Sequence, residues 1–353
     1  SRIVGAHSLA VCIWDIKLYQ FAIINNLFDG RSAVTMFFVL SGFVLSVGYL
    51  KYRERRLYLV PFFARRVTRI WMPWLAFFIV SWLCREYFFH SPSSSNPNLT
   101  EHHQHFWSSD SKTQDILKQL IYSLRDNSKA LLPQDWSLGI EMKSAIFIPI
   151  FLILAKRSSV LLLLFSLGLT FFIGTGYYYT SFGIGVCVAL AFCHLKADKI
   201  KGWMVCLFGF MLYQIRWAHT YMHFLEEQLN EKGVLLISAA GCGLILYGVL
   251  KSVKLQKVLE MPLLSHLGRV SYSLYLVQVI ILMCLAPWVI VFMNKMGIES
   301  YGWMQILLLL VVTGVSIFLA HFGERYIEIP CVKLGRVVTK IIKKFQFLER
   351  FRV

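Results

Sequence analysis

Hydrophobic residues occur along this chain in long runs that short polar or basic segments separate. The clearest run extends from Ala33 to Leu50 without a charged residue, which is about the length that a helix needs to cross a bilayer. The pattern predicts an all-α, polytopic integral membrane protein with about ten transmembrane helices. The predicted helices cover about residues 2–14, 32–50, 70–89, 137–155, 159–175, 181–195, 202–217, 233–250, 267–292 and 302–322.

The segments between the runs complete the predicted organisation. Residues 90–115 are polar and rich in proline and serine, which predicts a loop, and residues 116–130 predict a short interfacial helix. We expect a single helical bundle, one domain over residues 1–353, ending in a basic cytoplasmic tail at 323–353. Because the chain is apolar almost from Ser1, we expect its first helix to begin upstream of this residue.

The positive charges predict how the helices are oriented. If Ser1 and the basic segment 51–69 are placed in the cytoplasm, most of the 36 lysines and arginines fall on that side. Cytoplasmic loops of membrane proteins carry such an excess. Both termini are therefore predicted to be cytoplasmic, with residues 90–115 on the opposite side. The net charge of +17 fits a face that meets anionic lipid of the bilayer, and we expect no nucleic-acid partner.

Amino-acid composition supports a membrane protein and argues against metal and disulfide sites. The sequence is 57% hydrophobic and 15% aromatic, which is typical of a polytopic membrane protein. None of its eight cysteines forms a CxxC pair, so neither a zinc site nor a disulfide framework is predicted. His102, His103 and His105 cluster in the polar loop, where such histidines are usually solvated, and we expect no metal.

His7 is the first candidate for chemistry. It lies in or near the first apolar run, where an ionisable residue is often functional. A neutral imidazole can take a proton from a hydroxyl at pH near 7 without carrying a permanent charge in an apolar site. Asp15 is near in sequence and is a candidate to orient the imidazole, although a solvated loop carboxylate is the simpler interpretation.

The basic segment supplies the second group of candidates. Arg65, Arg66 and Arg69 lie on one predicted helical stretch, and guanidinium groups match phosphate oxygens. Anchoring to the cytoplasmic face is the alternative interpretation. Arg31 is a further cation at a membrane edge, and Ser41 is followed by a glycine, which would let a chain or cofactor approach closely.

Glu141 is the third candidate. It follows Trp136 and Ser137 in a predicted helix, and positions 137 and 141 are four apart, so they share one helical face. A carboxylate near the start of a membrane helix is also a plausible partner of the helix dipole, which is the structural alternative.

Four motifs in order along the chain resemble the membrane-bound acyltransferase 3 family. A weaker fifth, ERYIEIP at 324–330, ends with Glu328 before a proline at the close of the last predicted helix. The family often ends the fourth motif with histidine, whereas this chain has Gln278, which cannot titrate. The four motifs are AVTMFFVLSGFVLS at 33–46, RRVTRIWMP at 65–73, QDWSLGIEMKSAIFIPIF at 134–151 and GRVSYSLYLVQ at 268–278.

The resemblance implies roles for several of these residues. The family has a catalytic histidine late in its first helix and an arginine about three turns earlier. If His7 is that histidine, the arginine lies upstream of Ser1; if Arg2 is that arginine, the histidine position falls near Ile13 and is not filled. We favour His7, because its spacing to the following GRSAV is similar to the family's.

The resemblance also implies binding sites. Arg65, Arg66 and Arg69 are expected to contact the phosphates of the acyl donor, and Trp136, Ser137 and Glu141 match the family's WSL…E motif. The donor is expected to be acetyl-CoA, and Glu141 would orient the histidine or assist proton transfer.

The function expected from the motifs is that of a membrane-bound O-acyltransferase, most specifically an O-acetyltransferase of a bacterial inner (cytoplasmic) membrane. The variants GRSAV and WSLGIEMK are most similar to bacterial members that modify surface polysaccharides. The acetyl group would pass from cytoplasmic acetyl-CoA to a hydroxyl of an extracytoplasmic or lipid-linked glycan or glycolipid, such as a lipopolysaccharide O-antigen. Two alternatives stay open: a transporter of a lipid-linked or small substrate, and a catalytically silent acyltransferase-like scaffold.

Overall fold

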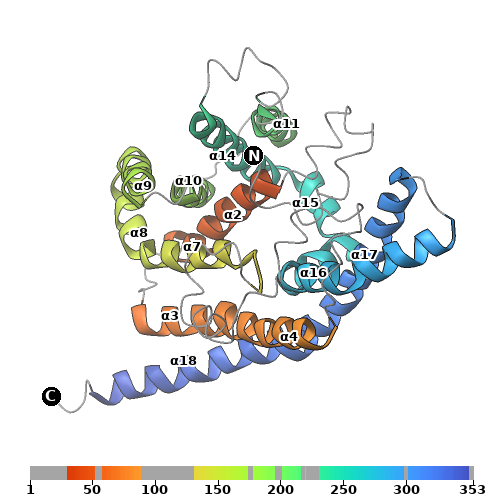
Figure 1. The fold of residues 1–353 in the computed structure, drawn as a ribbon. Helices are drawn as coiled ribbons and strands as arrows, with labels where there is room; N and C mark the ends of the chain where they lie inside the picture. The colour runs from red at the N-terminus through yellow and green to blue at the C-terminus, as the bar shows by residue number, and fades with distance from the viewer. Residues whose placement is uncertain are drawn as a thin grey trace. The chain divides into compact units, whose positions relative to one another are not determined.

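The described part of the chain is almost entirely helical and contains no strand, which confirms the predicted all-α class (Figure 1). The computed structural model describes residues 30–51, 58–88, 131–173, 178–194, 201–215, 219, 230–297 and 301–349. The helices are α2 (Gly30–Lys51), α3 (Leu59–Arg66), η3 (Val67–Trp71), α4 (Met72–Phe88), α7 (Asp135–Ile146), α8 (Ile148–Arg157), α9 (Ser159–Ile173), α10 (Tyr178–Cys193), α11 (Gly202–Tyr213), α14 (Glu231–Lys251), α15 (Val253–Leu259), α16 (Pro262–Lys295), α17 (Tyr301–Gly323), η4 (Glu324–Glu328) and α18 (Ile329–Glu349).

Several of these helices fit a membrane. Within the described ranges, five helical runs are long and apolar enough to cross a bilayer, and the bent pair of α7 and α8 would make a sixth. Three shorter apolar helices, α9, α10 and α11, accompany them. The predicted total of about ten transmembrane helices stays a prediction, because the first predicted helix at 2–14 lies outside the described residues.

Residues 59–69 of the basic segment and residues 323–349 of the predicted tail are helical. The helix predicted at about 70–89 begins earlier, at Leu59, and runs through α3 and η3 into α4. Pro61 in its first turn is compatible with a helix, because the first backbone N–H groups have no intrahelical partner. The predicted tail from 323 onward forms η4 and α18, which continue α17 without a break.

The described residues fall into two compact units. Unit 1 includes Tyr58–Gly139 and Leu263–Val353, and unit 2 includes Leu18–Leu57 and Ile140–Pro262. The single bundle and single domain expected from the sequence stay predictions.

In unit 2, glycines bring α2 and α10 into backbone contact. A Cβ at Gly42 would collide with the carbonyl oxygen of Phe182, and one at Gly185 would collide with the carbonyl oxygen of Val39. The sequence led us to expect that a chain or cofactor approaches closely at Ser41 and Gly42, and at Gly42 the chain of α10 does so. Small residues allow this packing where the surroundings are apolar on all sides.

The helices α11 and α14 of unit 2 use glycines in the same way. A Cβ at Gly209 would lie 2.8 Å from the carbonyl oxygen of Gly241, and one at Gly202 would lie 2.6 Å from that of Gly248. Gly202 and Gly209 are seven residues apart on α11, and Gly241 and Gly248 are seven residues apart on α14. Both contacts therefore lie on one face of each helix. The two helices therefore pack along most of the length of α11.

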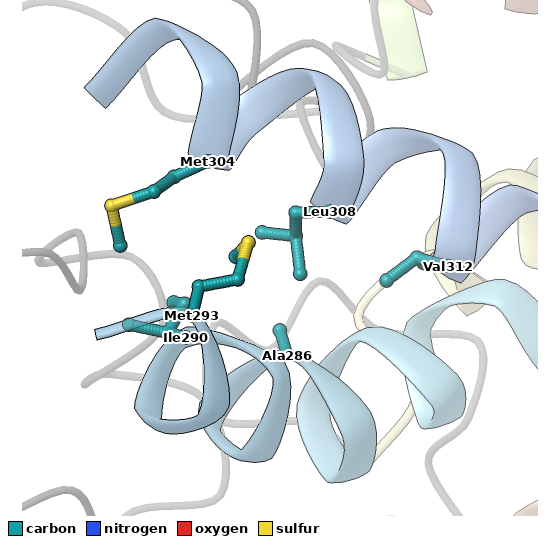
Figure 2. Close-up of a cluster of buried hydrophobic side chains, with 6 residues drawn as sticks. All are labelled: Ala286, Ile290, Met293, Met304, Leu308 and Val312. Carbon is teal, nitrogen blue, oxygen red and sulfur yellow. The ribbon is translucent and has the colours of Figure 1, made fainter. Parts of the chain in front are cut away.

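In unit 1, α16 and α17 pack through a stripe of apolar side chains (Figure 2). The stripe recurs every three to four residues on each helix, so it occupies one helical face. Figure 2 shows the side chains of the two helices pointing toward one another. The stripe consists of Ala286, Ile290 and Met293 on α16 and Met304, Leu308 and Val312 on α17.

Candidate active site

The sequence motifs of unit 1, which are far apart along the chain, are joined to one another by side-chain hydrogen bonds. We call this set of contacts the motif junction. It combines residues from the RRVTRIWMP, QDWS, GRVSYSLYLVQ and ERYIEIP segments. Its members are Ile70, Gln134, Ser137, Tyr272, Ser273, Tyr275 and Glu328, and Arg69 precedes Ile70 on the same π-helix.

The start of α7 is fixed to the middle of α16 by a small network. The Tyr275 hydroxyl donates to the carbonyl oxygen of Gln134 at 2.8 Å and lies 2.7 Å from the Ser137 hydroxyl. In return, the Gln134 side-chain N–H group donates to the carbonyl oxygens of Tyr275 and Leu276, each at 3.1 Å. Gln134 and Ser137 are both buried. The network thus sets the position of the helix that carries the WSL…E motif.

Buried polar atoms with no described partner accompany this network. Neither the side-chain oxygen of Gln134 nor the indole N–H of Trp74, which is 2% exposed, has a hydrogen-bond partner among the described residues. Buried polar groups are rarely left in this state. The Gln134 oxygen can accept a further hydrogen bond, and the Trp74 indole N–H can donate one.

The short π-helix η3 is tied to the same helix. The Tyr272 hydroxyl donates to the carbonyl oxygen of Ile70 at 2.6 Å. η3 contains Arg69, and it interrupts the regular helix between α3 and α4. Single π-helical turns of this kind are often found at functional sites.

A second π-helix, η4, supplies a carboxylate to the motif junction. The Ser273 hydroxyl donates to Glu328 Oε2 at 3.2 Å, and an attractive charge–charge interaction joins Arg69 to the same carboxylate. The approach of η4 to α16 is close, because a Cβ at Gly323 would lie 3.1 Å from the Ser273 Cβ. Glu328 does not end a helix, since α18 follows it directly.

The three arginines of the RRVTRIWMP motif have different surroundings. Arg65 and Arg69 are exposed, whereas Arg66 is 8% exposed. The Arg65 Nε group donates to the carbonyl oxygen of Pro61 at 3.3 Å, and this bond directs its guanidinium. Arg65 and Arg69 are therefore available to an anionic ligand, and Arg66 lies in the interior of the unit.

In unit 2, Glu141 is buried and hydrogen-bonded. The Ser41 hydroxyl donates to Glu141 Oε1 at 3.4 Å, and Glu141 is 5% exposed. Asp135 occupies the first turn of α7, so Glu141 lies too far along the helix to act as its dipole partner. Ser137 and Glu141 both belong to α7, as their spacing predicted.

The remaining candidates from the sequence are Arg31, Trp136, His7 and Asp15. Arg31, at the start of α2, forms an ion pair of 3.9 Å with Glu231, whose side chain is 79% exposed. Such a surface pair stabilises a fold only weakly. Trp136 is half-buried at the start of α7. His7 and Asp15 lie outside the described residues.

The sequence alone did not identify the polar side chains of α16 as candidates. Tyr272, Ser273 and Tyr275 belong to the GRVSYSLYLVQ motif and interrupt an otherwise apolar run. Polar residues inside a predicted membrane helix usually bond to partners within the protein, so the sequence did contain a sign that these residues matter. Their partners, however, lie far away in sequence. No group of histidine, cysteine or carboxylate side chains that would hold a metal occurs among the described residues.

Comparison with known proteins agrees with the motifs. A family model for an acyltransferase domain, that of the acyltransferase 3 family, matches residues 2–321. No curated protein and no solved structure matches the chain. The family match covers nearly the whole chain, including three of the four segments that meet at the motif junction. This chain therefore belongs to the acyltransferase 3 family.

Proposed function

We propose that this protein is a membrane-bound O-acetyltransferase that moves an acetyl group from cytoplasmic acetyl-CoA to a hydroxyl of an extracytoplasmic or lipid-linked glycan. Membership of the acyltransferase 3 family supports acyl transfer, and the apolar helices support a membrane location. The observation that carries the proposal is the motif junction, which places two exposed arginines beside a hydrogen-bonded framework of family motifs.

Arg65 and Arg69 are proposed to bind the diphosphate of the donor. A guanidinium group donates two parallel hydrogen bonds to phosphate oxygens and keeps its charge at any physiological pH. Tyr272 holds the η3 backbone at Ile70, next to Arg69, so the backbone that carries this arginine is fixed before a ligand binds. Arg66 is proposed to support the site from the interior.

The chemical step follows from the needs of thioester transfer. The acceptor hydroxyl oxygen attacks the thioester carbonyl carbon, the carbon–sulfur bond breaks, and the coenzyme A thiol leaves. The hydroxyl proton must pass to a base, and the departing sulfur must gain a proton. We assign the base role to His7, whose neutral imidazole suits neutral pH. Glu141, and in a lesser role Asp15, would stabilise the imidazolium that forms.

The location follows from the same scheme. Acetyl-CoA is made in the cytoplasm, so its arginine site belongs on the cytoplasmic face, with both termini on that side. The inner membrane of a bacterium is the proposed location, and surface polysaccharide such as lipopolysaccharide is the proposed acceptor class.

The donor site is tested by calorimetry of coenzyme A binding to the purified protein. Arg65→Ala and Arg69→Ala should each weaken binding about 10- to 150-fold, because a charge-assisted hydrogen bond contributes roughly 1.5–3 kcal/mol. Arg157→Ala, which removes an exposed cation at the end of α8 outside the motif junction, is the matched control and should bind like wild type.

Two results would contradict parts of the proposal. If Arg65→Ala and Arg69→Ala bind coenzyme A as tightly as Arg157→Ala does, the arginines are membrane anchors only. If wild type binds coenzyme A but transfers no acetyl group to any surface glycan, the protein is a silent relative that keeps the donor site.

A further inference from the structure

The helix α18 brings further cations to the arginines of the proposed donor site. α18 packs along α3 and η3, and Figure 1 shows it beside α3. The contact is close because position 335 is glycine. A Cβ there would collide with the Thr68 hydroxyl and lie 3.8 Å from the Cα of Arg65. The backbone of α18 therefore passes directly beside the RRVTRIWMP motif.

Three exposed cations form a stripe on α18, and Arg336 is the one turned least from the Gly335 contact, by about 100° around the helix. Lys333, Arg336 and Lys340 are three and four residues apart, so they lie along one helical face. Arg336 directly follows Gly335 and is thus the closest of them in sequence to the crossing point. Among the described residues, no carboxylate forms an ion pair with any of the three. Arg336 therefore adds positive charge close to Arg65, where the two helices cross.

The chemistry of the proposed donor suits such an arrangement. Coenzyme A carries a diphosphate between its thiol arm and its nucleotide, and a separate phosphate monoester on the 3′-hydroxyl of the ribose. η3 leads directly into the apolar helix α4, so Arg69 lies at the membrane end of the cations. The thioester must reach into the membrane protein, which places the diphosphate near Arg69 and the nucleotide farther out.

We infer that Arg336, assisted by Lys333 and Lys340, binds the 3′-phosphate of coenzyme A while Arg65 and Arg69 bind the diphosphate. The inference rests on the proposed function, since it names a second phosphate contact of the same donor. It gives α18 a role in ligand recognition, whereas its cations were expected from the sequence to mark only the cytoplasmic side.

The test compares coenzyme A with 3′-dephospho-coenzyme A, using calorimetry on the full chain in nanodiscs of zwitterionic lipid. Wild type should bind coenzyme A about tenfold or more tightly than the dephospho form, the difference expected for one charge-assisted phosphate contact. Arg336→Ala should weaken coenzyme A binding to the level of the dephospho form and leave dephospho binding unchanged. Arg336→Lys should restore part of the difference.

Two controls separate this contact from general effects. Arg65→Ala should weaken both ligands by the same factor, because both carry the diphosphate. Lys344→Ala removes a cation about 12 Å farther along α18 and should keep the wild-type preference.

The outcomes distinguish the inference from the proposed function. If wild type binds both ligands equally, or if Arg336→Ala keeps the full preference for coenzyme A, the inference is overturned while the donor site stands. The cations of α18 would then serve the lipid surface alone. If wild type binds neither ligand, the proposed donor itself is wrong. The comparison on wild type needs no variant, so a variant that fails to fold does not prevent the test.

Discussion

Unit 1 and unit 2 differ in which helix contacts predominate among the described residues: side-chain hydrogen bonds in unit 1 and close glycine contacts in unit 2. In unit 2, glycines such as Gly42 and Gly209 place helix backbones in contact. In unit 1, hydroxyl and amide side chains such as Tyr275 and Gln134 join helices by hydrogen bonds. Burying a polar side chain is unfavourable unless it is bonded, whereas a glycine contact needs only a small residue. The polar contacts of unit 1 therefore fix particular positions, and the glycines of unit 2 fix distances between helices.

The largest effect is expected on the rate of acetyl transfer, from removal of the proposed base. His7→Ala should lower the rate of acetyl transfer about 10²–10⁴-fold, the usual loss when a general base is removed, with little change in coenzyme A affinity. Glu141→Gln should lower the rate too, because a neutral amide cannot stabilise an imidazolium. Rates would be measured on membranes that contain equal amounts of each protein.

The control for this pair is His194→Ala, which changes an exposed histidine after α10 and should keep the wild-type rate. If His7→Ala is fully active, the match of His7 to the family histidine is wrong. The base should then be sought elsewhere, first at Asp15.

The next effect tests the glycine packing of unit 2. Gly185→Ala should lower the free energy of unfolding by about 1–3 kcal/mol, because the new Cβ meets the Val39 carbonyl and the backbones must move apart. Gly168→Ala is the matched control in α9, where a Cβ meets nothing within 4 Å; it should be neutral or raise stability by about 0.5–1 kcal/mol. Thermal and denaturant unfolding in one detergent would measure both. Equal stability of the two variants would contradict the packing role of Gly185.

The smallest effect tests the hydrogen bonds of unit 1. Tyr275→Phe keeps the ring and removes the hydroxyl that contacts Gln134 and Ser137, so stability should fall by about 0.5–1.5 kcal/mol. Tyr326→Phe changes a tyrosine that is 66% exposed and should leave stability unchanged. The same unfolding measurements apply. A Tyr275→Phe protein as stable as Tyr326→Phe would show that the network does not hold α7 to α16.

The sequence predicted the apolar helices well, because their signal is local. The run from Ala33 to Leu50 became α2, and the predicted helix at 233–250 became α14 with nearly the same bounds. Such runs are uncharged inside and polar at the ends, so their limits can be read directly. The basic helix α18 was predicted as a tail, since cations among its apolar residues lower the mean hydropathy below that of a membrane helix.

The candidate site was only partly predictable for a different reason. The spacing of Arg65, Arg66 and Arg69 indicated a helix, but not that Arg66 alone would be buried, which depends on the helices packed around it. Tyr272 and Glu328 are hydrogen-bonded to residues on distant segments, Ile70 and Ser273 respectively. Local patterns carry no information about these tertiary contacts.

Mass spectrometry of the surface glycan measures the proposed acetyl transfer at its product. Glycan from cells with the gene, without it, and with the gene restored as wild type or as Arg69→Ala would be compared. The proposed function predicts that acetyl groups are lost when the gene is removed, return with wild type, and return weakly or not at all with Arg69→Ala. Glycan acetylation that is unchanged by removal of the gene would contradict it.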